Sequence, residues 1–395
     1  MCRIPAPKRT GARPCIVSVF PASKKLCFPV EFMSNYVAPL NSTNNIAIAS
    51  PAEKQGKKFL NPVPTGMMQP GSLIRMIRRL LLENQLGEPS RPLGPFLTDA
   101  AVYAQPPLQG LRVTWMGHSS LLIEIDGHRI LTDPVWSERA SLVSFVGPKR
   151  FYGPPLALED LPPLDAVLIS HDHYDHLDRA TIEKLAATST TRQASWICSL
   201  GVGRYLESWG VARPRITELN WGDVVSVTEH LQITATPTRH FSGRSLWGRN
   251  ETLWSSFVIR GNQHNIFFGA DSGFFPGFRQ IGDVYGPFDL TMLEIGAYGE
   301  DWPDIHMGPI KAAEAHTQLQ GKLLLPIHWG LFNLAFHPWR EPVERLIHVA
   351  EKENLPLFLP RPGCPTEVTG ASLHTFWWEM QDEPKLTSLR VPSPA

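Results

Sequence analysis

The feature that most constrains this chain is a dense run of metal-binding side chains, Ser170-His171-Asp172-His173-Tyr174-Asp175-His176. It follows an apolar run beginning at Ala166, which predicts a buried strand, and precedes a predicted helix at Ala180–Ala187. Three imidazoles and one carboxylate lie within six residues of this loop. Such side chains are costly to bring together unless a divalent metal ion binds them, and histidine with aspartate suits zinc.

The spacing within this loop is compatible with two ions. On an extended backbone His171 and His173 point the same way, whereas Asp175 and His176 belong to the following turn. One ion can therefore take the first pair and a second ion the other, at the roughly 3.5–4 Å separation of two-metal hydrolases. Asp172 and Tyr174 alternate with these ligands and are expected to face away.

Further candidate ligands each follow a predicted strand, and they are His240, Asp271 and His328. In α/β folds, binding sites form at the carboxyl ends of strands. The shared placement therefore favours all three as ligands that complete two metal sites.

Short strands and helices alternate along the rest of the chain, which predicts an α/β fold with a large core. A helix is predicted at Pro309–Leu319. The predicted strands are Arg112–Met116, Leu121–Ile125, Arg129–Thr132, Leu231–Ala235, Ser256–Ile259, Asn265–Phe268, Leu290–Leu293 and Lys322–Pro326.

Composition excludes several classes of protein. Lys+Arg and Asp+Glu each number 37, so a general nucleic-acid binder, which needs a basic surplus, is not expected. No apolar run reaches the roughly 18–20 residues of a spanning helix, so we expect a soluble or peripherally membrane-associated protein, with the cytoplasm favoured. The five cysteines lack any CxxC spacing, which argues against a cysteine zinc site.

The chain divides into four expected regions. Residues 1–58 are expected to be disordered, and residues 59–110 to form an N-terminal segment with an amphipathic helix at Ser72–Leu86. That helix either docks on the core or lies on a membrane surface through Arg75, Arg78 and Arg79. Residues 111–360 form the expected catalytic domain, and 361–395 a C-terminal tail.

The pattern His-x-His-x-Asp-His, followed at a distance by His, Asp and His, resembles the metallo-β-lactamase superfamily. That resemblance implies a four-layer αββα sandwich. Longer stretches resemble the N-acylphosphatidylethanolamine-hydrolysing phospholipase D family, and this similarity covers roughly Phe59 to Phe358. The stretches are Val113-Thr114-Trp115-Met116-Gly117-His118, Leu131-Thr132-Asp133-Pro134, Gly147-Pro148-Lys149-Arg150-Phe151, Asp165-Ala166-Val167-Leu168-Ile169-Ser170, Ile295-Gly296-Ala297-Tyr298 and Ile327-His328-Trp329-Gly330.

The resemblance implies two zinc ions and a role for each matching residue. One ion would be held by His171, His173 and His240, and the other by Asp175, His176 and His328, with Asp271 bridging them. Asp175, Asp271 and His306 would be catalytic, and His306 and Tyr298 would contact substrate. His118 is expected to hold a loop or a ligand. For His306, a helix-start histidine without a catalytic part stays open.

The activity implied is that of a zinc phosphodiesterase of the phospholipase D type. Its substrate would be an N-acylphosphatidylethanolamine-like phospholipid, cleaved to N-acylethanolamine and phosphatidic acid, with peripheral membrane contact and a homodimer left open. The loop from His240 to Thr252 departs from the lipid-hydrolysing members, which leaves the substrate open. A lactonase or amide hydrolase of the same fold, or a non-enzymatic metal-binding scaffold, are the alternatives.

Overall fold

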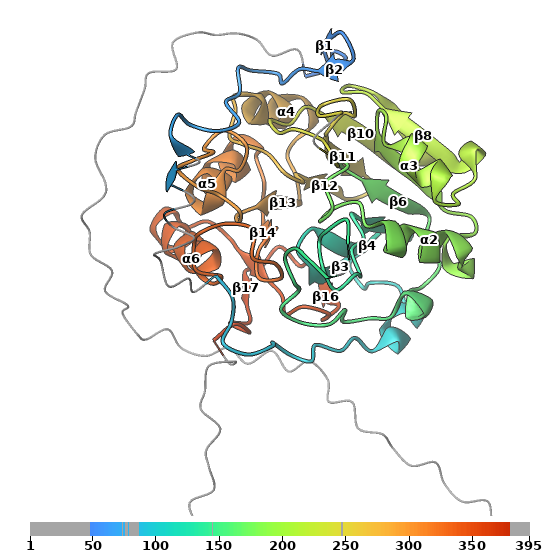
Figure 1. Cartoon of the computed structure of the whole chain (residues 1–395). Helices are drawn as coiled ribbons and strands as arrows, with labels where there is room; N and C mark the ends of the chain where they lie inside the picture. The colour runs from blue at the N-terminus through green and yellow to red at the C-terminus, as the bar shows by residue number, and fades with distance from the viewer. Residues whose placement is uncertain are drawn as a thin grey trace, which may run out of the picture.

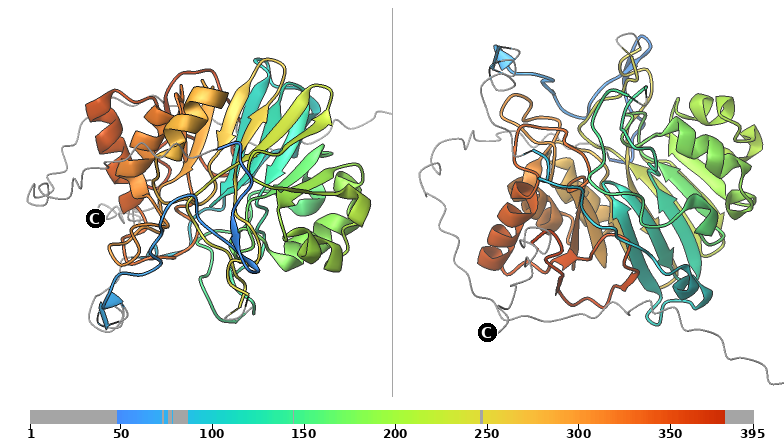
Figure 2. Two further views of the ribbon diagram at one scale, coloured as in Figure 1. Left: turned by 90° about the horizontal axis from the view of Figure 1, so that it is seen from above. Right: turned by 60° about the horizontal axis from the view of Figure 1, so that its bottom comes forward.

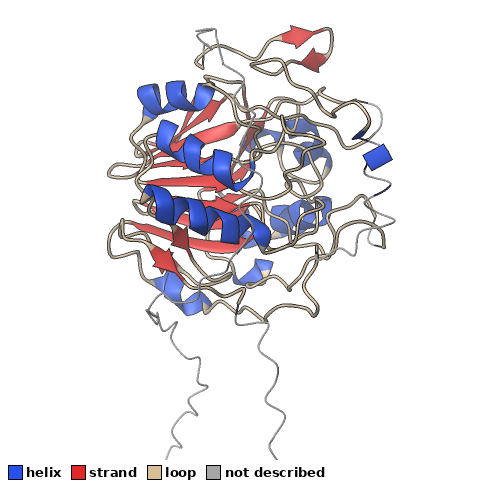
Figure 3. Ribbon diagram, turned by 90° about the vertical axis from the view of Figure 1, so that its left-hand side faces the viewer, coloured by secondary structure: helices blue, strands red, loops and turns tan. Residues whose placement is uncertain are grey.

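The computed structural model describes residues 48–72, 74–75, 78, 87–143, 145–245 and 248–379. Two β-sheets pack face to face, and helices cover the outer face of each (Figures 1 and 2). Figure 3 shows the helices of one outer layer in front of the strands and those of the other behind them. The expected four-layer αββα sandwich is confirmed.

The larger sheet has seven strands in the order β16-β3-β4-β5-β6-β7-β8. These are β3 (Leu111–Gly117), β4 (Ser120–Ile125), β5 (His128–Thr132), β6 (Ala166–Ile169), β7 (Ser195–Ser199), β8 (Ile216–Leu219) and β16 (Thr366–Glu367). Its outer face carries α2 (Arg179–Ala187) and α3 (Gly203–Ser208).

The second sheet has six strands in the order β14-β13-β12-β11-β10-β9. These are β9 (Val224–Thr228), β10 (Leu231–Thr236), β11 (Ser256–Arg260), β12 (Asn265–Phe268), β13 (Leu290–Glu294) and β14 (Leu324–Ile327). Its outer layer contains α4 (Gly277–Tyr285), α5 (Gly308–Gln318) and α6 (Glu341–Glu353). Short 3-10 helices occupy loops at Ala100–Ala104, Leu158–Asp160, Ser189–Thr191 and Arg213–Arg215.

Strand β6 shows how apolar runs build these layers. Successive side chains of a strand point to opposite faces of its sheet. Ala166 and Leu168 accordingly join the core between the two sheets, whereas Val167 and Ile169 join the core beneath α2 and α3. A strand covered on both faces needs apolar residues at every position, which is why the run is continuous.

The predicted elements are confirmed to within one or two residues. The predicted strands Ser256–Ile259 and Asn265–Phe268 pair antiparallel, with Phe257 of β11 opposite Phe268 of β12, and the helix predicted at Pro309–Leu319 corresponds to α5. Strands β7 to β9 and helices α3, α4 and α6 were not predicted.

The N-terminal boundary at residue 58 is wrong for the described residues. Strands β1 (Lys54–Gln55) and β2 (Lys58–Phe59) form a hairpin. Phe59 is buried with Trp221, Leu253 and Trp254, and this apolar contact orders a segment of otherwise polar composition. The expected disorder of residues 1–47 lies outside the described residues.

The C-terminal boundary at residue 360 is also wrong. Strand β16 pairs antiparallel with β3, and β15 (Phe358–Leu359) pairs with β17 (Leu373–His374). Trp377 and Trp378 are buried in the main core. The segment expected to be a tail therefore completes the sheet and the core as far as residue 379.

The expected amphipathic helix lies only partly within the described residues, of which 72, 74, 75 and 78 are helical. Arg75 Nε donates to Asp301 Oδ1 at 2.7 Å, and Ser72 Oγ donates to the Asp301 carbonyl at 3.2 Å. These contacts favour the docked alternative at the start of the helix. Within the described part of the chain, every helix is too short or too polar to cross a bilayer.

Candidate metal centre

The predicted ligands meet at one edge of the sandwich. The loops after β6, β10, β12 and β14 carry His171, His240, Asp271 and His328 respectively. Strands β12, β13 and β14 run parallel, as do β5 and β6, so their carboxyl ends reach the same edge of each sheet.

The backbone at this edge adopts conformations that side chains usually avoid. His118, Asp133, Ala270, Ala297 and His328 all have positive φ, between 34° and 61°. Such conformations cost of order 1–3 kcal/mol each and persist where the surrounding structure enforces them, typically at functional sites. One of these residues, His328, is a predicted ligand, and another, His118, was expected to hold a loop or a ligand.

The predicted ligands fall into two of the three groups of donor atoms found among the described residues. In the first group, His118, Asp175, His176 and His328 offer ligand atoms that all lie within 4.8 Å of one another. Nε2 of His328 is 3.3 Å and Nε2 of His176 is 3.6 Å from Oδ2 of Asp175. The sequence predicted the last three residues as one ligand set.

The second group contains His171, His173, His240 and Asp271. Nδ1 of His173 lies 2.9 Å from Nε2 of His171 and 3.3 Å from Nε2 of His240. These residues match the other predicted set, including its shared carboxylate.

Asp271 lies between the two groups. Its Oδ2 is 3.1 Å from Nε2 of His328 and 3.2 Å from Nε2 of His176. The same oxygen is 3.7 Å from Nε2 of His240 and 3.9 Å from Nε2 of His171. One carboxylate oxygen therefore faces imidazoles of both groups, as a bridging ligand would.

The spacing of these atoms fits metal coordination. Ligands about 2.05 Å from one ion at the tetrahedral angle lie about 3.3 Å apart, close to the separations found here. Nε2 of His176, Nε2 of His328 and Oδ1 of Asp271 are buried and make no hydrogen bond. Because orphaned buried polar atoms are costly, these three atoms indicate a partner such as a metal ion.

Hydrogen bonds at the opposite ring nitrogens orient the imidazoles. Nδ1 of His176 lies 2.8 Å from Oδ2 of Asp133, and Nδ1 of His240 lies 2.9 Å from the carbonyl of Ile305. Nδ1 of His171 contacts Oγ of Ser170, which donates to Asp133 at 2.6 Å. With Nδ1–H donating, each Nε2 keeps its lone pair for the centre.

Burial sets the charge of most of these histidines. It lowers the pKa of His118 to about 3 and that of His173 to about 4, so both rings are neutral at pH 7. Burial also holds the pKa values of His171 and His240 well below the usual histidine range. Neutral imidazole is the form that binds a metal ion.

Two histidines behave differently because carboxylates face them. Burial opposes their charged form, but the negative charge of Asp271 and Asp175 raises the pKa of His328 to about 10. The same carboxylates raise the pKa of His176 well above its usual range. Burial would raise the pKa of Asp271, yet the charges of His176 and His328 hold it well below its ordinary value. Without an ion, protons on these imidazoles balance the carboxylates.

The part of the chain that carries these ligands matches a known protein family. The family profile described as "Beta-lactamase superfamily domain" matches residues 128–329, more than half of the chain. The chain belongs to the beta-lactamase superfamily. A protein of Mycobacterium tuberculosis is 44% identical over 344 residues, covering 86% of this chain and 90% of that relative.

A second relative of this superfamily member carries a functional name. The "N-acyl-phosphatidylethanolamine-hydrolyzing phospholipase D 1" of Caenorhabditis elegans is 38% identical over 234 residues, covering 57% of this chain and 65% of that protein. Among solved structures, an isothiocyanate hydrolase from Delia radicum gut bacteria superposes with a TM-score of 0.52 at 18% identity, covering 64% of this chain and 97% of that one. That likeness shows the shared fold. The family, the relatives and the donor groups together support a metal-dependent hydrolase of the metallo-β-lactamase fold.

Sequence reasoning missed two carboxylates that support this superfamily site. Asp133 accepts hydrogen bonds from the backbone and hydroxyl of Ser170 and from His176. Glu294, the fully buried last residue of β13, lies 2.5 Å from Nδ1 of His306 through Oε2. Glu294 also forms a third potential metal-binding group with Asp271, His306 and His328. A lone carboxylate at the end of an apolar strand was the available signal.

The contacts of His118, Asp172 and Tyr174 agree with the positions expected for them. Nε2 of His118 lies 2.9 Å from Oδ2 of Asp175, as expected for a residue that holds a ligand. Asp172 accepts from the amide of Gly243, and Tyr174 donates to the carbonyl of Arg244, so both face away from the donors as predicted.

Tyr298 lies in the loop after β13, and its expected contact with substrate stays a prediction. Its hydroxyl donates to Oε1 of Glu341 on α6 at 2.8 Å, and its ring stacks on His337 with centroids 4.6 Å apart. Tyr298 is not part of the three donor groups found among the described residues. The hydroxyl connects the loop after β13 to α6.

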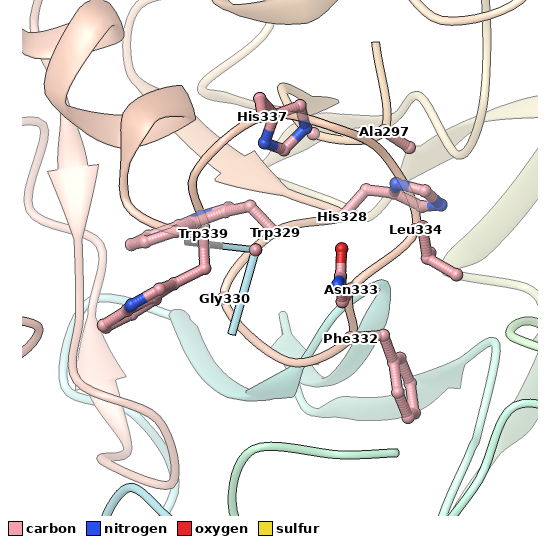
Figure 4. Close-up of a pocket in the computed structure, with 11 residues that line it drawn as sticks. Ala297, His328, Trp329, Gly330, Phe332, Asn333, Leu334, His337 and Trp339 are labelled. Carbon is pink, nitrogen blue, oxygen red and sulfur yellow. The ribbon is translucent and has the colours of Figure 1, made fainter. Parts of the chain in front are cut away.

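A small hollow opens beside His328 (Figure 4). Trp329 and Phe332 line it together with Asn333, Leu334 and Trp339. Trp329 also stacks on Trp115 with ring centroids 5.5 Å apart, so it belongs to the core as much as to the hollow. The hollow next to the donor groups is therefore lined by both aromatic and polar side chains.

Proposed function

We propose that this protein is a dinuclear zinc phosphodiesterase of the phospholipase D type. Its substrate is an N-acylphosphatidylethanolamine-like phospholipid, which it hydrolyses to N-acylethanolamine and phosphatidic acid. The placement of Asp271 carries the proposal, because its Oδ2 lies 3.1–3.9 Å from imidazole nitrogens of both donor groups. The named C. elegans relative and the family motifs in the sequence support the choice of substrate.

The proposed ligands follow the two groups. His171, His173 and His240 would hold one ion, Asp175, His176 and His328 would hold the other, and Asp271 would serve both. Imidazoles with few carboxylates favour zinc over magnesium or calcium, which prefer sites built from oxygen ligands. When bound, a zinc pair supplies Lewis acidity and brings the pKa of water close to neutrality.

The chain's own residues then act on the lipid. Nδ1 of His306 is engaged by Glu294, which leaves Nε2 as the ring nitrogen available to substrate. The His306 ring lies 5.1 Å from that of His240 and 5.2 Å from that of His328. We assign Nε2 of His306 to contact a phosphoryl oxygen or to protonate the leaving oxygen.

The test combines metal analysis with product formation. Wild-type protein is expected to carry two zinc ions and to release N-acylethanolamine, whereas Asp271→Ala and His328→Ala lose both properties. Asp172→Ala, which alters a carboxylate of the same loop that faces away, is the matched control.

A second assay separates the bond types. Hydrolysis of bis(p-nitrophenyl) phosphate is compared with hydrolysis of lactones and β-lactams. Zinc-loaded protein that cleaves only the carbonyl substrates would replace the phosphodiesterase proposal with that of a lactonase or amide hydrolase. A zinc-loaded protein inert on every class would indicate a metal-binding scaffold.

A further inference from the structure

A hairpin after β5 exposes an unusual amount of apolar surface. The exposed fractions of Leu142, Val143, Phe145 and Val146 are 76%, 38%, 77% and 57%. Single exposed apolar residues are common on soluble proteins, but four within five positions form a contiguous patch. Such patches mark surfaces that bind a partner or a membrane.

The base of this hairpin is polar, and its two limbs are joined by backbone pairing. The backbones of Arg139 and Lys149 form an antiparallel β-bridge between its two limbs, and the amide of Ala140 donates to the carbonyl of Pro148. Residues 140–148 between these cations contain no charged side chain. Lys149 pairs with Glu138 at 2.8 Å, but both side chains are more than half exposed, so this ion pair is weak.

Both limbs are attached to the loops that carry candidate metal ligands. On one limb, the amide and hydroxyl of Ser137 donate to Asp178, which lies two residues beyond His176. On the other limb, the amide of Phe151 donates to the carbonyl of Leu331, three residues beyond His328. The two limbs of the hairpin are therefore hydrogen-bonded to both loops that carry these ligands, which fixes its position relative to the donor groups.

We propose that the apolar side chains at the tip of this hairpin, those of Leu142, Val143, Phe145 and Val146, insert into the surface of a lipid bilayer and direct the metal centre toward it. Apolar side chains at the tip suit the boundary between headgroups and acyl chains, and Arg139 and Lys149 at the base lie at the level of lipid phosphates. The inference rests on the proposed function in one respect, because a phospholipid substrate is presented at such a surface.

The observations favour a bilayer over a protein partner. A stable protein interface buries about 800 Å² on each side, more than the side chains of one hairpin tip provide. The only polar side chains between the two cations are those of Ser141 and Ser144, too few to specify a partner by hydrogen bonding. A bilayer needs no such specificity.

Vesicle flotation of the full-length, zinc-loaded protein tests the proposal. Vesicles of phosphatidylcholine alone and of phosphatidylcholine with phosphatidylglycerol are compared for wild type, Leu142→Ser/Phe145→Ser and Phe145→Trp. We expect wild type and Phe145→Trp to bind, more strongly to the anionic vesicles at low salt. The double variant should bind at least tenfold more weakly.

Leu108→Ser/Val284→Ser is the matched control, because it removes two apolar side chains that are 94% and 60% exposed elsewhere. It should bind like wild type. All variants should keep the wild-type zinc content and turnover of bis(p-nitrophenyl) phosphate, since the tip residues are not ligands.

Several results would overturn the inference. Wild type that fails to float with either vesicle would do so, as would equal binding by the hairpin and control variants. A wild-type dimer that Leu142→Ser/Phe145→Ser converts to a monomer, with unchanged vesicle binding, would show that the tip is a protein interface. Flotation requires no hydrolysis, so selective loss of binding supports the inference even if the protein proves inactive on phospholipids.

Discussion

The imidazole of His306 is held by the carboxylate of Glu294, with Nδ1 and Oε2 2.5 Å apart. Glu294 is completely buried, and its Oε1 accepts from the amides of Ser272 and Met307. One carboxylate thus connects the loop that carries Asp271 with the loop that carries His306. Glu294 is therefore a positioning residue whose effect should pass through His306.

We predict that His306→Ala lowers kcat on the phospholipid substrate, whose alkoxide leaving group needs a proton, by roughly 10²–10⁴-fold, the range expected for a lost proton donor. Glu294→Gln should lower kcat by about tenfold because the neutral amide orients the ring less firmly. The double variant should match His306→Ala, since residues acting through one another are not additive. Losses that multiply in the double variant would show that Glu294 acts independently.

Asp133→Asn should weaken zinc binding by roughly 10–100-fold, as is usual when a partner that orients a ligand is altered. The reason is that Asp133 holds His176 directly and His171 through Ser170. Affinity is measured by competition with a chromogenic chelator. Asp172→Asn serves as control, and equal affinities for the two variants would refute the orienting role of Asp133.

Metal binding should release protons near pH 7. In the metal-free protein, Asp271 and Asp175 raise the pKa of His328 to about 10 and that of His176 well above its usual range, so both rings are protonated. An incoming ion must displace these protons, so we expect release of about two protons and tighter binding as pH rises. Calorimetry in buffers of different ionisation enthalpy counts them, and heats that do not depend on the buffer would contradict this prediction.

Trp377→Ala should lower the free energy of unfolding by about 3–5 kcal/mol, the usual cost of emptying a large core site. The Trp377 ring is 1% exposed and lies 5.3 Å from that of Trp329 and 5.4 Å from that of Phe96. Denaturant titration of metal-loaded protein measures the loss. Leu108→Ala, at a 94% exposed position, should be close to neutral. Similar stability of the two variants would argue against a structural role for the C-terminal segment.

Most of the candidate site could be predicted because its members obey two local rules. His171, His173, Asp175 and His176 lie within six residues, so their clustering needs no knowledge of topology. His240, Asp271 and His328 each follow a strand, and strands of one sheet bring their ends together. The pairing of specific donors across the two sheets could not be derived from spacing alone.

The missed features lack such local patterns. Glu294 is the last residue of a strand that was predicted to end at Leu293, so its carboxylate was not considered a candidate site residue. Strands β16 and β17 span two residues each, too few for an alternating pattern. Their order depends on pairing with β3 and β15 and on the burial of Trp377 and Trp378. Two adjacent tryptophans in a polar segment were the signal for that burial.

The number of zinc ions bound per chain tests the central proposal most directly. Elemental analysis after equilibrium dialysis against zinc should give two ions for wild type and a reduced number for Asp271→Ala, because Asp271 Oδ2 faces both donor groups. Two ions retained by Asp271→Ala, or a single ion bound by a wild type with all seven predicted ligands intact, would contradict a bridged dinuclear centre.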